Sequence, residues 1–337
     1  MLAHYPNPER PSWQHALARA IRDPQDLLDE LELSHELLPA ARRAAARFPL
    51  VVPRGFVARM RRGDPSDPLL RQVLPLDDEL TELPGFSPDP VHDLKAEVAP
   101  GVLHKYPGRV LLITTGACGV HCRYCFRREF PYETSSTENS TWREATTYIS
   151  GDPSIREVIL SGGDPLSLSD RRLGLLFEAL GSIPHVERIR IHTRQPIVLP
   201  ERVDTGLIAT LGQRPPSFAL VVVIHANHAQ EIDERVAIAL GQLRQAGAML
   251  LNQAVLLRGV NDTEEALVAL SESLARVGVL PYYLNVLDRV RGSAHFEVDE
   301  ARGLELMAAL RARLPGYLVP RLVSDRPGNS SKTILSE

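Results

Sequence analysis

The sequence has few cysteines, no excess of basic charge and no long apolar run. Its 337 residues include three cysteines, and its formal net charge is −4. Without a basic excess, the chain lacks the electrostatic field of a primary nucleic-acid-binding protein. No apolar segment approaches the roughly 18 residues of a membrane-spanning helix, and the N-terminus carries no secretory or transit peptide. We therefore expect a cytoplasmic protein that binds neither nucleic acid nor membrane.

All three cysteines lie within residues 118–125, with the spacing C-x3-C-x2-C. An odd number of thiols without an export sequence argues against disulfides. Thiolates are preferred ligands of iron–sulfur clusters, and three can hold three irons of a cubane while its fourth iron stays open to a small amino acid-like ligand. One alternative is a zinc site completed by His121 or a distant histidine, although a structural zinc needs four ligands. The other is a set of unliganded thiols.

The first hundred residues are rich in proline and in helix-forming residues. We predict helices over residues 13–21, over residues 24–33 with Asp23 as N-cap and Pro24 in the first turn, and over residues 37–46. Residues 53–68 carry turn-forming residues, and residues 84–100 are predicted to be largely irregular. The expected first unit is thus a helical N-terminal region and linker, residues 1–100.

Beyond residue 110, short β-branched runs alternate with helical stretches. Strands are predicted at 110–114, 158–160, 188–192, 220–225, 250–255 and 282–286, and helices at 142–149, 173–180, 205–211, 232–246, 263–277 and 300–314. Such alternation implies parallel strands joined by right-handed crossovers. We predict an α/β fold, an incomplete (β/α)6 TIM-like barrel over residues 101–315, followed by a C-terminal tail over residues 316–337.

Polar segments follow the predicted strands, where barrels of this type carry their active sites. The segment 161–166 contains Gly162, Gly163 and Asp164. Its glycines would let backbone approach a ligand closely, and its acid can take an ammonium group, but a plain tight turn before a helix is the alternative. His192 and Asn261, in two other such segments, are either ligand-lining residues or structural hydrogen-bonding groups.

The cysteine segment and the aromatic residue after it resemble the signature of the radical S-adenosylmethionine (SAM) enzymes. Further segments extend the resemblance, over essentially the whole chain, to the lysine 2,3-aminomutase family: 103–107, 122–128, 161–166, 191–196, 256–262 and 325–333. Within that family, segments 282–288, 294–296 and 316–321, and the end of the chain shortly after Lys332, resemble the bacterial branch that makes (R)-β-lysine for elongation factor P. The resemblance implies an isomerase that moves an amino group with a 4Fe–4S cluster, SAM and pyridoxal 5′-phosphate (PLP).

Residue roles follow from the resemblance. It implies that the cluster is bound by Cys118, Cys122 and Cys125, and that PLP is bound covalently by Lys332 and contacted by Tyr106 and Arg109. The SAM site would be formed by Gly162, Gly163, Asp164, His225 and Gln253. Arg127 matches the residue that binds the substrate carboxylate, and Asp288 and Asp325 match the acids that hold the ε-ammonium group. The run Gly328-Asn-Ser-Ser331 stands where the family has glycines before Lys332, and it should be stiffer and more polar.

The expected partners are L-lysine as substrate, an electron donor such as flavodoxin or ferredoxin, and, functionally, elongation factor P and its β-lysine ligase. A second hypothesis keeps the chemistry but changes the substrate to glutamate or arginine; glutamate would favour a basic residue at Asp288 and Asp325. A third is a non-catalytic iron–sulfur or zinc protein that binds RNA or another partner, which predicts a basic surface and no SAM cleavage.

Overall fold

One ten-stranded sheet, with its strands in the order β1 to β10, runs through the computed structural model, which describes residues 12–133 and 139–335. The strands from β3 to β9 pair in parallel, and antiparallel strands flank them at both edges. The strands are β1 (Glu97–Ala99), β2 (Val102–Tyr106), β3 (Arg109–Thr115), β4 (Glu157–Gly162), β5 (Arg188–Thr193), β6 (Ala219–Ile224), β7 (Met249–Val255), β8 (Leu280–Asn285), β9 (Arg321–Ser324) and β10 (Thr333–Ile334).

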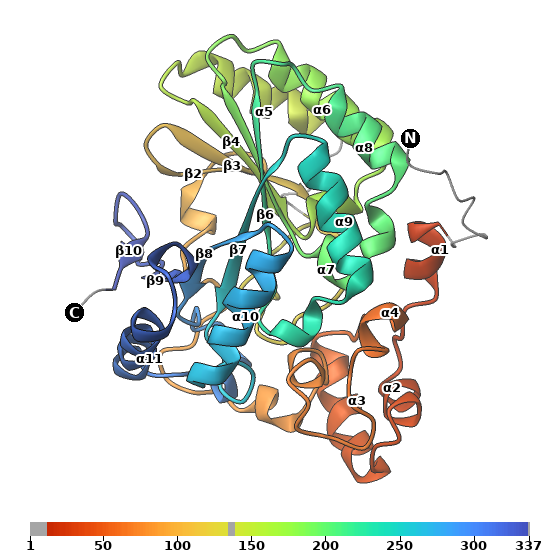
Figure 1. Ribbon diagram of the computed structural model, residues 1–337. Helices are drawn as coiled ribbons and strands as arrows, with labels where there is room; N and C mark the ends of the chain where they lie inside the picture. The colour runs from red at the N-terminus through yellow and green to blue at the C-terminus, as the bar shows by residue number, and fades with distance from the viewer. Residues whose placement is uncertain (1–11, 134–138, 336–337) are drawn as a thin grey trace.

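Helices follow the parallel strands, and the longer ones cover the outer face of the curved sheet (Figure 1). They are α5 (Asn139–Gly151), α6 (Asp170–Gly181), α7 (Gln195–Val198), α8 (Thr205–Gly212), α9 (Glu234–Gln245), α10 (Glu264–Arg276) and α11 (Glu300–Arg313). Side-chain oxygens of Ser169, Asp204, Asp233 and Thr263 cap α6, α8, α9 and α10 at the N-terminus. The predicted incomplete barrel is confirmed, and each of its six predicted strands and six predicted helices lies within a few residues of an observed element.

Four strands were not predicted, and all lie at the sheet edges. β1 and β2 form an antiparallel hairpin against β3, and β1 falls in the stretch that we expected to be irregular. β9 pairs in parallel with β8 and closes the sixth unit, while β10 folds back against β9. These strands are short, so they contain too few residues to show a clear alternating pattern.

The N-terminal region contains α1 (Trp13–Ala18), α2 (Pro24–Glu30), α3 (Leu38–Arg47) and α4 (Arg54–Val57). Asp23 accepts a hydrogen bond from the Gln25 amide, which confirms the predicted cap of α2. The apolar residues of this region share one continuous core with the barrel, and the two lie side by side in Figure 1. None of the helices in the described residues has the length and apolarity needed to cross a membrane.

Backbone and side-chain contacts join this region to the cysteine segment. The His121 amide donates to the Val51 carbonyl (2.9 Å) and the Arg123 amide to the Gln72 carbonyl (2.9 Å). The buried Arg123 guanidinium forms a two-point ion pair with Glu79, at 2.8 and 2.6 Å. The N-terminal region therefore holds the segment that carries all three thiols.

Candidate active site

A cavity of about 1220 Å³ lies inside the curved sheet. Its wall includes residues from the cysteine segment, from the ends of β4 to β8 and from the turn between β9 and β10. Every site residue predicted from the sequence lines it: Tyr106, Arg109, Cys118, Cys122, Cys125, Arg127, Gly162, Gly163, Asp164, His225, Gln253, Asp288, Asp325 and Lys332. The topology thus brings together residues that lie more than 200 positions apart in sequence, as with Tyr106 and Asp325.

The three thiols are unpaired and partly buried. Burial raises the pKa of Cys118, and it raises that of Cys125 to about 11; neighbouring thiols act in the same direction. A positively charged group bound to them would reverse this and hold them as thiolates. Within the described residues, no three His, Cys, Asp or Glu side chains converge on a single-ion site. A cubane needs no such convergence, because each thiolate binds a different iron; the donor set fits a cluster.

The glycine-rich loop packs against the backbone that leads into the cysteine segment. Gly163 donates its amide hydrogen to the Thr115 carbonyl at 2.7 Å, and Asp164 donates to the Ala117 carbonyl at 2.8 Å. Gly162 has φ +114°, and a Cβ there would lie 2.7 Å from the Thr115 oxygen. Any side chain at these two glycines would push the loop away from the cysteine segment.

The side chain of Asp164 is used by the protein itself. Its two carboxylate oxygens accept four hydrogen bonds, from the Thr193 hydroxyl and from the amides of Leu166, Arg194 and Gln195. We expected this carboxylate to take an ammonium group. Because each oxygen already accepts two hydrogen bonds, the geometry instead gives it the role of fixing the end of β5 beside the glycine loop.

Lys332 lines the cavity in a polar cluster. Its Nζ donates to Asn285 Oδ1 at 3.1 Å and lies 3.6 Å from Asp325 Oδ2. Tyr106 donates its hydroxyl hydrogen to Asp325 Oδ1 at 2.9 Å, and the Arg109 guanidinium carbon lies 4.8 Å from the centre of the Tyr106 ring. The structure therefore brings four of the predicted residues into direct contact or van der Waals range.

Asp288 follows β8 and lines the same cavity. Burial raises its pKa from 3.8 to about 6; Lys332 opposes this rise and Asp325 adds to it. Lys105 and Asp93, which line the same cavity, act on Asp288 as well. A further ammonium group bound there would favour the ionised form of Asp288.

Arg127 is buried and held in a fixed orientation. Its Nε donates to Asp93 Oδ2 at 2.7 Å and its Nη1 to Ser161 Oγ at 3.0 Å. Lys105 Nζ lies 2.6 Å from the other oxygen of Asp93. Asp93 was missed because it lies in the irregular stretch before β1, and Lys105 was part of a family segment to which we assigned no role.

Within the described part of the chain, His225 and Asn261 use their polar side-chain atoms in contacts with the protein, whereas His192 does not use its Nε2. His225 Nε2 lies 2.8 Å from the Tyr124 hydroxyl, and burial lowers the pKa of this histidine. His192 lines the cavity, and its buried Nε2 has no hydrogen-bond partner among the described residues, which is expected of an atom that awaits a ligand. Asn261 bonds to the backbone of Leu257, Asn227 and Val255, so its role is structural.

Comparison with known proteins gives close relatives along the whole chain. The chain is 45% identical over 329 residues to L-lysine 2,3-aminomutase from Escherichia coli (strain K12), covering 97% of this chain and 95% of that protein. It is 40% identical over 329 residues to L-lysine 2,3-aminomutase from Haemophilus influenzae, covering 98% and 97%. No family model matches the sequence. Among solved structures, a radical SAM methyltransferase from Sphaerobacter thermophilus covers 66% of this chain and 68% of that chain, with 17% identity and a TM-score of 0.42.

Proposed function

The chain belongs to the lysine 2,3-aminomutase family of radical SAM enzymes, and on that premise we propose that it converts L-lysine to (R)-β-lysine for the modification of elongation factor P. It is an isomerase of the lysine 2,3-aminomutase type. The product and the link to elongation factor P are supported by the resemblance of segments 282–288, 294–296 and 316–321 to one bacterial branch of the family.

One observation carries the proposal: three thiols, a lysine with an acid pair, and a buried arginine line one cavity. In this assignment Cys118, Cys122 and Cys125 hold a 4Fe–4S cluster, and Lys332, Tyr106 and Arg109 hold PLP. SAM is held by the backbone of the glycine loop 162–164 together with His225 and Gln253. When bound, the cluster and SAM supply a radical that removes a hydrogen atom, and PLP supplies the π-system that lets an amino group migrate.

The substrate is recognised at its two charged ends. Arg127 binds the carboxylate of lysine, and Asp93 and Ser161 fix the plane of its guanidinium beforehand. Asp288 and Asp325 hold the ε-ammonium group. Two carboxylates around one cation are favourable; burial raises the pKa of Asp288 and Asp325 adds to that rise, so a bound ammonium group would offset both.

The residues around Lys332 control its proton. An ammonium cannot act as a nucleophile, so Lys332 must lose a proton before it can bind the PLP aldehyde. Asp325, 3.6 Å from Nζ, is the carboxylate that can accept this proton, and the Asn285 amide oxygen, 3.1 Å from Nζ, keeps Nζ in place during the transfer. Tyr106 holds the second oxygen of Asp325, which fixes the orientation of that carboxylate.

Glutamate and arginine are the competing substrates. A glutamate side chain would meet two acids where it needs a cation, so the acid pair favours lysine over glutamate.

An electron donor such as flavodoxin or ferredoxin would reduce the cluster, and a β-lysine ligase would pass the product to elongation factor P.

An anaerobic assay tests the function. Reconstituted protein is incubated with SAM, PLP, dithionite and L-lysine, and the products are separated by chiral chromatography. We expect (R)-β-lysine from lysine and no β-amino acid from glutamate or arginine, with the Cys122→Ala variant as the inactive control. Turnover of glutamate or arginine in preference to lysine would reject the substrate, and intact SAM after reduction would reject the chemistry.

A further inference from the structure

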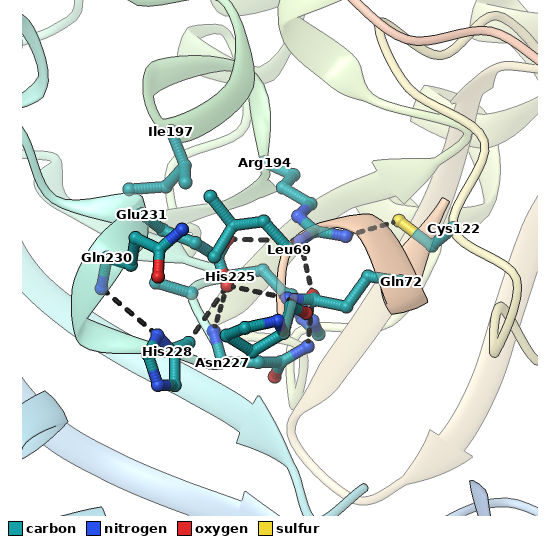
Figure 2. A network of polar contacts seen from close by, with 12 residues as sticks. Leu69, Gln72, Cys122, Arg194, Ile197, His225, Asn227, His228, Gln230 and Glu231 are labelled. Atoms are coloured by element: carbon teal, nitrogen blue, oxygen red, sulfur yellow. Dashed lines mark hydrogen bonds and ion pairs between the residues drawn. The ribbon is translucent and has the colours of Figure 1, made fainter. Parts of the chain in front are cut away.

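Arg194, at the end of β5, reaches the sulfur of a cysteine that we assign to the cluster (Figure 2). Its Nη1 donates to Cys122 Sγ at 2.7 Å and to the Tyr124 hydroxyl at 2.7 Å. The side chain is only 7% exposed. A guanidinium remains charged at every physiological pH, so this is a charge-assisted hydrogen bond to sulfur at the wall of the cavity.

The other side of the guanidinium is anchored. Its Nη2 donates to Gln72 Oε1 at 2.6 Å and to Glu231 Oε2 at 3.0 Å. Glu231 is fully buried, and its other oxygen accepts from Gln72 Nε2 (3.1 Å) and from the Asn227 amide (2.8 Å). Figure 2 shows Gln72, Glu231 and Asn227 grouped to one side of the Arg194 guanidinium, which reaches Cys122 on its other side. The network joins the N-terminal region, β5 and the end of β6, and it leaves Arg194 one orientation.

We propose that Arg194 donates a hydrogen bond to the Cys122 sulfur of the assembled cluster and thereby raises the reduction potential of that cluster. The inference rests on the cluster assignment made above. Reduction adds negative charge to the cluster and its sulfurs, so a fixed cationic donor stabilises the reduced form more than the oxidised form. Arg194 is a positioning residue in this account: it acts on the cluster through Cys122.

The chain offers a matched control in Arg202, a second arginine that is buried and hydrogen-bonded. Its Nε donates to the Leu166 carbonyl at 2.6 Å and its Nη2 to the Leu168 carbonyl at 3.1 Å. It pairs with Asp170 at 2.8 Å, and none of its described contacts involves a cysteine. Replacing Arg202 therefore removes a buried, paired guanidinium without removing a donor to sulfur.

The test is a potentiometric titration of the reconstituted cluster, followed by EPR in the absence of SAM. We compare the wild type with Arg194→Gln, Arg194→Lys and Arg202→Gln, after iron and sulfide analysis of each protein. For Arg194→Gln we expect the ratio of reduced to oxidised cluster at a fixed potential to fall about tenfold, a decrease of about 59 mV. Glu231 keeps its charge in that variant and acts in the same direction. Arg202→Gln should leave the potential unchanged.

Arg194→Lys keeps the charge but has one nitrogen to serve both Cys122 and the Gln72–Glu231 pair, so its potential should fall by less. If Arg194→Gln binds no cluster, two other measurements test the proposal. One is the reduction potential of Arg194→Lys. The other is the iron–thiolate stretch of the wild type in resonance Raman spectra, which should shift in D2O. A lysine or glutamine variant with the wild-type potential overturns the proposal. A wild-type protein that assembles no 4Fe–4S cluster rejects the proposed function instead, so the two failures are distinct.

Discussion

Replacing Asp288 by asparagine should stabilise the ligand-free protein and weaken its binding of lysine. The carboxyl group lines the cavity, and burial raises its pKa from 3.8 to about 6. Above pH 6 the folded protein therefore contains an ionised carboxylate that would be better solvated in the unfolded chain. An amide of nearly the same shape removes that cost, because it carries no charge.

The magnitude follows from the pKa. A rise from 3.8 to about 6 corresponds to about 3 kcal/mol at 1.36 kcal/mol per pH unit. Water in the cavity screens the charge, so we expect about 1–3 kcal/mol, or about 1–4 °C in Tm. Because folding raises the pKa of this carboxyl group, its ionisation lowers the free energy of unfolding as the pH rises. The cost is absent below pH 3.8, grows between pH 3.8 and 6, and is constant above.

The assay is thermal unfolding of the cofactor-free wild type and Asp288→Asn at several pH values from 4 to 8. The Tm of the variant should exceed that of the wild type by an amount that grows up to about pH 6–7 and then stays level. The same substitution at the exposed Asp299 is the control for the loss of one carboxylate, and the gain in Tm at Asp288 should exceed it above pH 6. A variant that is less stable than the wild type at pH 8, or a difference that is equal at pH 4 and pH 8, would refute the reasoning.

In the reconstituted enzyme the same variant should bind lysine more weakly. A hydrogen bond between charged groups contributes about 1.5–3 kcal/mol, so KM for lysine should rise at least tenfold. An unchanged KM would remove Asp288 from the ammonium site while leaving the stability argument intact. Together, the Tm and KM measurements separate the destabilisation caused by the buried Asp288 carboxylate from its contribution to lysine binding.

Three more variants test the other parts of the site. Cys122→Ala should lose the iron and the visible absorbance of the cluster, and retention of a full 4Fe–4S complement would exclude this cysteine as a ligand. Lys332→Ala should keep its iron but lose the absorbance of covalently bound PLP at about 400–430 nm; an undiminished band would contradict the assignment. Asp93→Asn leaves Arg127 and Lys105 facing each other without a shared carboxylate, so KM for lysine should rise about tenfold at unchanged iron content. A fall in kcat alone would instead place Asp93 outside substrate binding.

The sequence predicts the parallel barrel well because its strands are apolar runs separated by capped helices. β6, for example, reads Ala-Leu-Val-Val-Val-Ile, and α9 begins at an aspartate that caps it. It predicts that the polar segments share one rim because parallel strands all end on the same edge. The resemblance then assigns a role to each motif residue, and every residue so assigned lines the cavity.

The supporting residues cannot be found in this way, because their partners are distant in sequence. Asp93 meets Arg127 across 34 positions and Gln72 meets Arg194 across 122. Neither lies in a periodic element: Asp93 precedes a short 3-10 turn, and Gln72 ends another. A polar residue in an irregular segment has no local pattern that marks its partner, so only the folded chain identifies it.

The turn before Lys332 differs from the family in sequence, and the hairpin around it limits the effect of that difference on the position of the lysine. Asn329, Ser330 and Ser331 replace glycines of the family and should stiffen the loop. The loop joins β9 to β10, and Thr333 pairs with Ser324 across that hairpin. Asn329 Nδ2 also donates to Thr333 Oγ1 at 2.8 Å. Strand pairing and this side-chain bond both fix the residue next to Lys332, so the position of the lysine depends on the hairpin and not on glycine flexibility.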